Sequence, residues 1–157
     1  MHSRIFQVSR KPISQEDLIE EYRYEDSFVG SHADYVVKQS ESEGIDDLDW
    51  LQTATKGLEI DTEKKTITIT SKEKFFETKH EKFQELLEKL QYMSLKEFSN
   101  AQNSFDMYDL ESAYNDKYGF YIDDNDEYCG LTTLDDWVRN AEENKTYYVG
   151  NIFDYHC

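Results

Sequence analysis

Alternation of apolar and polar residues predicts strands in four regions of the chain. It occurs near the amino end, in the middle, and twice near the carboxyl end, where β-branched and aromatic residues are frequent. A period of two residues is typical of strands that bury one face. The predicted strands are residues 4–9, 58–61, 66–70, 118–122 and 147–155.

The two central strands are predicted to form a hairpin. Leu58 and Ile60 alternate with acids, residues 62–65 turn the chain, and the returning strand places Ile67 and Ile69 on one face. A short loop between two alternating segments is a common hairpin connection.

Helical spacing and capping residues predict the elements between the strands. Ser14 and Thr133 are each followed by acids in a first helical turn, where side-chain caps and the helix dipole favour them. The expected short helices are residues 14–19, 31–37, 46–57 and 133–138, with a loop over residues 39–44.

The longest predicted helix follows the hairpin. Thr70 and Glu73 have the spacing of a capping box, and Ser94 with Glu97 repeats that spacing at the start of a further helix expected to reach Tyr114. An apolar stripe along the first of these helices is expected to pack on the core. Its members are Phe76, Phe83, Leu87 and Leu90.

These elements predict an α+β fold. We expect residues 1–157 to form a single domain with a largely antiparallel sheet, built from an amino-terminal strand, the central hairpin and carboxyl-terminal strands, and packed with several helices. The 157 residues include 23 aromatic ones, which is too many for a disordered chain. The predicted core is therefore rich in aromatic rings.

Acidic residues are distributed unevenly along the chain. The formal net charge is −17, and residues 14–52 and 101–157 each contribute −10, whereas residues 53–100 hold nine acids and nine bases. Such acidity argues against direct binding of nucleic acid or of anionic membranes, because both are negative. Charge of one sign restricts which partners approach and says little about fold.

The location expected for this chain is cytoplasmic. The amino end has no apolar signal-peptide core, and no window of the sequence approaches 18 apolar residues. Cys129 and Cys157 are too few for a disulfide framework, which favours a reducing compartment.

The first acidic block is a candidate binding surface. Like-charged pairs four residues apart, such as Glu16 with Glu20, each cost roughly 0.2–0.5 kcal/mol in a helix, whereas Glu85 faces Lys89 in the middle helix. This contrast indicates either a negative face kept for a basic partner or an ordinary solvated face. The candidate residues are Glu16, Asp17, Glu20, Glu21 and Glu25.

The second acidic block combines aspartates with tyrosines. Tyrosine is enriched at interfaces, and together with carboxylates it suits a partner rich in arginine or lysine, through cation–π contacts and bidentate pairs. The alternative is that the tyrosines pack on the core side of strands. The candidate residues are Tyr121, Asp123, Asp124, Asp126, Glu127 and Tyr128.

A calcium loop does not fit this second block. With Gly130 at the invariant turn position, Asn125, Glu127 and Cys129 fall on ligand positions 1, 3 and 5, and Asp136 falls on position 12. An EF-hand needs Asp first and a bidentate Glu last. Weak divalent binding by Asp123, Asp124 and Asp126 is a minor alternative to a solvated turn.

No other motif in the sequence carries chemistry. His32, His156 and the two cysteines lack the spacing of a metal site, and there is no nucleophile elbow, phosphate-binding loop or dinucleotide fingerprint. No cofactor and no resident metal are expected.

The sequence therefore favours a binding or inhibitor-type module that presents acidic, tyrosine-bearing surface to a basic protein, with imitation of nucleic acid as one version. Imitation requires both acidic blocks to converge on one face. On this hypothesis, replacing Asp123 and Asp124 with lysine abolishes binding and leaves stability equal or higher. The alternatives are a housekeeping domain without a charge-driven partner and, less favoured, a divalent-metal enzyme that uses residues 123–126.

Overall fold

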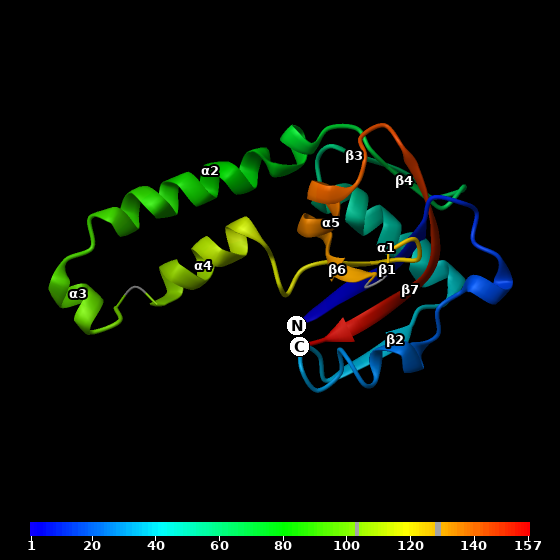
Figure 1. Ribbon diagram of the computed structural model, residues 1–157, viewed down its shortest axis with the longest axis horizontal. Coiled ribbons are helices and arrows are strands. Elements are labelled where there is room, and N and C mark those ends of the chain that lie inside the picture. Colours follow the sequence, from blue (N-terminus) through cyan, green and yellow to red (C-terminus); the bar gives the residue numbers. More distant parts are fainter. Residues whose placement is uncertain (103, 128–129) are drawn as a thin grey trace.

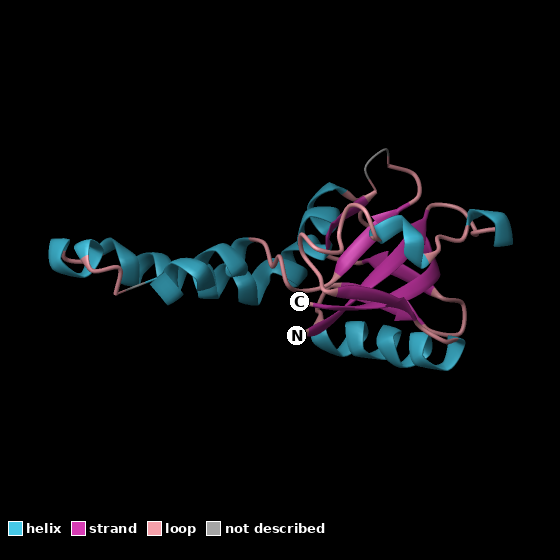
Figure 2. Ribbon diagram, turned by 90° about the horizontal axis from the view of Figure 1, so that it is seen from below, coloured by secondary structure: helices cyan, strands magenta, loops and turns pink. Residues whose placement is uncertain are grey.

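The computed structural model of the protein describes residues 1–102, 104–127 and 130–157 (Figure 1). It contains a seven-stranded sheet in the order β3-β4-β7-β1-β5-β6, with β2 also paired to β7. Helices pack on the sheet and extend from it (Figures 1 and 2). The predicted α+β class and the largely antiparallel sheet are confirmed.

The two strands nearest the termini form the centre of the sheet. β1 (His2–Ser9) pairs antiparallel with β7 (Thr146–His156) along almost its whole length. The first half of β7 also pairs with β4 (Thr66–Ile69), and the second half pairs with β2 (Tyr35–Lys38). The chain ends consequently lie side by side (Figure 1).

The other edge of β1 carries the only parallel pair among the assigned strands. β5 (Tyr121–Asp124) runs parallel to β1, and β6 (Leu131–Thr133) pairs antiparallel with β5. β5 is therefore an interior strand with neighbours on both sides. On the far edge, β3 (Leu58–Asp61) and β4 form the predicted hairpin, with Leu58 opposite Ile69.

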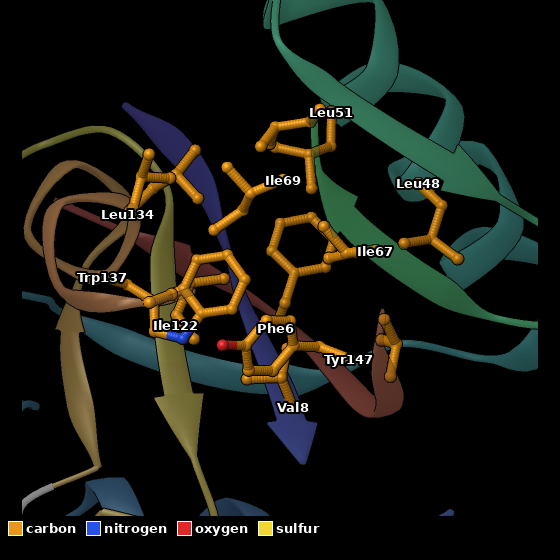
Figure 3. Packing of buried hydrophobic residues seen from close by; sticks show 14 of the residues in the cluster. Phe6, Val8, Leu48, Leu51, Ile67, Ile69, Ile122, Leu134, Trp137 and Tyr147 are labelled. Atoms are coloured by element: carbon orange, nitrogen blue, oxygen red, sulfur yellow. The ribbon is translucent and has the colours of Figure 1, made fainter. Parts of the chain in front are cut away.

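Each face of the sheet has its own apolar cluster. Phe6 and Val8 of β1 point into the larger cluster, which is covered by α1 (Glu41–Ala54) and α5 (Leu134–Asn140) (Figure 3). Ile5 points to the opposite face, as the pleat requires. There it contacts a cluster that includes Tyr24, Phe28, Phe153 and Tyr155.

Residues 14–34 cover this second face with little regular structure. They contain two 3-10 helices, η1 (Gln15–Asp17) and η2 (Glu21–Tyr24). Short 3-10 segments of this kind are common as connectors. The predicted helix at 14–19 is therefore reduced to one turn, and η2 was not predicted.

Helices α2 (Lys72–Gln91), α3 (Leu95–Ser99) and α4 (Ser104–Tyr114) form an arm that projects from the body (Figures 1 and 2). Only the first turns of α2 reach the core, through Phe75 and Phe76. Farther along, α2 packs against α4. The prediction that the stripe of α2 packs on the core is confirmed for Phe76 and wrong for Phe83, Leu87 and Leu90, because most of this helix pairs with α4 instead.

Several predicted boundaries are corrected by nonlocal pairing. The segment predicted as a helix at 31–37 contains strand β2, because the second half of β7 offers it a hydrogen-bonding edge that suits its valines. The predicted loop at 39–44 contains the start of α1, which Ser40 and Glu43 cap reciprocally. β5 starts at Tyr121 instead of 118, and β6 was not predicted.

Of four predicted caps, two are confirmed, one is shifted, and Ser14 stands at the N-cap of η1 without a side-chain cap hydrogen bond. Ser94 and Glu97 form a capping box, and the Thr133 side chain accepts a hydrogen bond from the backbone N–H of Asp136. The cap of α2 is Ser71 rather than Thr70. The single helix predicted from Ser94 to Tyr114 is divided into α3 and α4.

Gln7 joins the irregular segment to the sheet from a fully buried position. Its Nε2 donates to the Asp17 carbonyl at 2.7 Å, and its Oε1 accepts from the backbone N–H groups of Ile19 and Asn151, each at 3.1 Å. The register of β1 against β7 shifts at this residue. Gly150 is required beside it, since a Cβ there would lie 2.4 Å from Gln7 Oε1.

Removing this amide should therefore destabilise the fold. We expect Gln7→Ala to lower the free energy of unfolding by about 3 kcal/mol, because two buried N–H groups lose their acceptor. Gln91→Ala, at the exposed end of α2, should stay within about 0.5 kcal/mol of the wild type. Urea denaturation of both variants tests this, and equal midpoints would contradict it.

Candidate functional site

The five candidate acids of the first block are all exposed. Glu16 and Asp17 lie on η1, Glu20 caps η2, Glu21 begins it, and Glu25 follows it. They do not share a continuous α-helix, so the predicted repulsion between residues four apart does not apply in the form expected. The structure confirms their exposure and corrects their helical setting.

Two of these acids have local partners. Glu20 lies 3.1 Å from Lys38 Nζ, and Glu21 accepts a 2.7 Å hydrogen bond from the backbone N–H of Lys38. These contacts fasten η2 to β2. Exposed ion pairs of this kind contribute little stability, so the block still presents a strongly negative surface.

An exposed tyrosine that sequence reasoning missed lies within this block. Tyr22 is 73% exposed and follows Glu21 in η2. The combination of tyrosine with carboxylates, predicted for the second block, is therefore found on the surface of the first. Tyr22 is flanked by acids in the sequence, as the tyrosines of the second block are, but the helix predicted at 14–19 ended before it.

Asp123 is buried, which corrects its predicted place on an exposed surface. Its carboxylate accepts from Arg23 Nε at 2.9 Å and Nη2 at 3.1 Å, and from the Tyr24 hydroxyl at 3.1 Å. The physical reason is the interior position of β5, where both faces of the strand are covered. Asp123 thus ties η2 to the sheet.

Asp124 and Tyr121 are also buried, so the expectation of surface exposure is wrong for them too. Asp124 accepts a hydrogen bond from Trp137 Nε1 at 3.1 Å and from the backbone N–H of Asp126 at 2.9 Å. The Tyr121 hydroxyl donates to the Lys117 carbonyl at 2.9 Å. The core-packing alternative holds for Tyr121, while Tyr128 and Cys129 lie outside the described residues.

Asp126 and Glu127 are exposed and meet Asp17 of the first block. Together they line a polar recess of about 530 Å³ at the carboxyl ends of β1 and β5. Lys11 and Arg23 line the same recess, and the Asp126 carboxylate accepts a 2.6 Å hydrogen bond from the backbone N–H of Arg10. The two acidic blocks thus meet at a recess that basic side chains also line.

Most of the remaining acids do not converge on that recess. α1 carries exposed Glu41, Glu43, Asp46 and Asp49, and it covers the face of the sheet opposite residues 14–34. A continuous row of carboxylates drawn from both blocks, which imitation of nucleic acid requires, is therefore not formed by these residues.

The divalent-metal alternative gains no support from the described part of the chain. Within it, no group of three or more His, Cys, Asp or Glu side chains could hold a metal ion. Asp123 and Asp124 are instead occupied by Arg23, Tyr24 and Trp137. None of the described helices is both long and apolar enough to span a membrane.

The arm carries a second candidate surface of opposite character. Four large apolar side chains around its far end are each at least 75% exposed, and we call them the arm tip: Tyr92, Leu95, Phe98 and Phe105. A groove of about 520 Å³ lies along α2 and α4, and we call its lining the arm groove: Phe83, Met107, Tyr108, Leu110, Glu111 and Tyr114.

Helix α4 is apolar on both sides. Ala113 is buried, whereas Met107, Tyr108 and Tyr114 are between 51% and 59% exposed. The arm holds its shape through the Lys89–Asp106 ion pair at 2.7 Å and the Phe83–Tyr114 ring contact at 6.2 Å. Monomeric soluble proteins rarely expose a contiguous apolar patch of this kind without an interaction role.

Comparisons of this chain with protein-family models, with curated proteins and with solved structures found no match. The fold and these surfaces define an α+β domain with an acidic body and an apolar helical arm. Its function has to be argued from these surfaces.

The buried ion pair gives a direct test of the corrected role of Asp123. Asp123→Ala should lower the free energy of unfolding by about 3 kcal/mol, because Arg23 and Tyr24 lose a buried acceptor. Asp123→Asn, which keeps an acceptor for the Tyr24 hydroxyl, should lose less. Asp26→Ala on the exposed loop should leave the free energy of unfolding nearly unchanged. If denaturation curves show unchanged stability for Asp123→Ala, the buried structural role assigned to Asp123 is wrong.

Three buried tyrosines should make the fold sensitive to alkali. Burial raises the pKa of Tyr121 to about 12 and raises the pKa values of Tyr24 and Tyr155 further above their ordinary range. The unfolded chain releases these phenol protons near pH 10, so it binds fewer protons than the folded chain above that pH, and stability falls as pH rises.

We therefore expect the free energy of unfolding to be level up to about pH 9 and to decrease steeply between about pH 10 and 12. Tyr121→Phe should make that decrease shallower. Urea titrations at each pH measure both curves, and identical slopes for the two proteins would contradict the assignment.

Proposed function

We propose that this protein is a protein-binding module that recognises a basic protein through an acidic face on its body. We define the acidic face as the exposed residues Glu16, Asp17, Glu20, Glu21, Tyr22, Glu25 and Asp26. The observation that carries this proposal is Tyr22, 73% exposed among six exposed carboxylates.

The chemistry of the acidic face suits arginine- and lysine-rich surfaces. Tyrosine offers a rigid apolar ring with a polar tip, and it attracts cations over its face. Carboxylates around it pair with guanidinium groups. Because the whole chain carries a net charge of −17, its field also accelerates the approach of a positive partner.

The acidic face is held in place before binding. Gln7 fixes the backbone at Asp17 and Ile19, and the buried Asp123 carboxylate fixes Arg23 next to Tyr22. A pre-ordered surface loses less conformational entropy on association than a mobile loop. The irregular segment can therefore act as a defined recognition surface.

Charge reversal tests the proposal. We expect Glu16→Lys, Glu25→Lys and Asp26→Lys together to slow association with a basic protein captured by the wild type by about tenfold or more, because steering is lost. The matched control reverses Glu59, Glu63 and Glu73, which are exposed on the hairpin and on the first turn of α2. Surface plasmon resonance with the captured protein gives both rates.

The salt dependence of binding is a second test of this proposal. Affinity should fall as sodium chloride rises from about 0.05 to 0.5 M, since screening shortens the reach of the charges. Binding that is insensitive to salt, or lost equally in the control variant, would refute the acidic face. If the wild type captures no basic protein, the proposal is refuted, and the net charge then serves only solubility.

A further inference from the structure

We propose that the arm groove binds the same groove of a second copy of this chain, so that two arms pack antiparallel as a four-helix bundle. This inference concerns a surface separate from the acidic face. The groove contains five apolar or aromatic side chains and one acid, Glu111, which is already paired with Lys117. Among the described residues, no basic side chain lines it.

The arm has the pattern of an incomplete bundle. In the arm, α2 and α4 pack on each other, and their seam buries Leu86 and Ala113. Met107, Tyr108 and Tyr114 of α4 remain more than half exposed, although the Tyr114 ring contacts Phe83 of α2 and the Tyr108 ring contacts Tyr118. A helix that is apolar on opposite sides is ordinarily covered on both, and a second helical hairpin covers such a face in four-helix bundles.

Charge favours a second copy over a basic partner at this surface. Helix α2 holds five acids and five bases, and α4 holds three acids and no base, so the two helices together contribute −3 to the net charge of −17. A basic protein is drawn toward the body rather than toward the arm. Two copies repel each other through their bodies, and the arm is where that repulsion is weakest.

An antiparallel arrangement keeps the two bodies apart. A 20-residue helix such as α2 spans about 30 Å, which exceeds the Debye length of about 8 Å at physiological ionic strength. Each body then lies beyond the tip of the other arm. Such a two-fold contact is closed, because each copy contributes the same surface.

The exposed area is of the size that a specific dimer needs. Five arm aromatics are between 51% and 82% exposed, and at about 200 Å² for each side chain they expose roughly 700 Å². A standard interface buries about 800 Å² on each partner. Leu95 and Met107 add to this area; the five aromatics are Tyr92, Phe98, Phe105, Tyr108 and Tyr114. Only Tyr108 and Tyr114 line the groove, so an antiparallel contact of this size also covers the arm tip.

The body remains free in this dimer. Residues 10–20, drawn in blue in Figure 1, lie at the end of the body opposite the arm. Packing of two arms thus leaves η1 open to solvent. A dimer would present two acidic faces, and it would gain avidity for a partner with two basic sites.

Sedimentation equilibrium of the full chain tests the inference. At about 100 μM the wild type should have twice the 18.7 kDa mass of the chain. Raising sodium chloride from about 0.05 to 0.5 M should strengthen this dimer, because salt screens the repulsion between the bodies. That response is opposite to the one expected for a basic partner on the acidic face.

Paired variants locate the contact. Met107→Glu with Tyr108→Glu should raise the dimer Kd by about tenfold or more, because charges would be buried at the contact. Tyr22→Glu, at an exposed aromatic of the body, should leave the dimer intact. Circular dichroism of each variant should match the wild type, since both replaced arm side chains are more than half exposed.

A monomeric wild type at every salt concentration would overturn the proposal, as would a dimer that survives the arm variant or is lost in Tyr22→Glu. A monomer whose arm gains protection from hydrogen exchange only when a different protein is added would also overturn it, and would assign the groove to that protein. Loss of the dimer in Tyr22→Glu would place the contact on the acidic face, whereas the other results leave the acidic face untouched, because its own test uses charge reversals on the body.

Discussion

The backbone ladder between β1 and β7 is the interaction on which the rest of the structure depends. It joins the two ends of the chain, and every other sheet connection starts from one of these two strands or from a strand paired to them. β7 is long enough to pair with β4 along one half and with β2 along the other. Because both faces of this ladder are apolar, one face requires α1 and α5, and the other requires the irregular segment 14–34.

This requirement decides where the negative charge can act. Covering the second face brings Arg23 onto buried Asp123, and Arg4 contacts both Asp47 and Asp154. Lys79 likewise pairs with buried Asp135 at 2.7 Å. Bases are scarce in this chain, and several of them are used to neutralise buried carboxylates, which are costly when unpaired. The exposed acids of residues 14–34 are left with few partners, so the acidic face is a consequence of how the core is closed.

Local patterns predicted what local interactions determine. β1, β7, the hairpin of Leu58 with Ile69, and the Thr133 cap follow from alternation, turns and side-chain caps within a few residues. β2 and the burial of Asp123 could not be predicted in this way, because each depends on a strand distant in sequence. The site was predicted in part: the five candidate acids between residues 16 and 25, together with Asp126 and Glu127, are exposed, but the acid-rich appearance of residues 121–124 concealed an interior strand.

The arm shows a further limit of periodicity. A repeating apolar stripe establishes that a helix buries one face, but it does not identify what covers that face. In α2 the stripe is divided between the core, which Phe76 contacts, and α4, where the Phe83 ring contacts Tyr114. The same reasoning applies to α4, where Met107, Tyr108 and Tyr114 remain more than half exposed. A chain with a net charge of −17 resists self-association over most of its surface. Placing its apolar surface on a projecting helix pair that contributes only −3 to that charge therefore confines association to one geometry, because other contacts bring more like charges together.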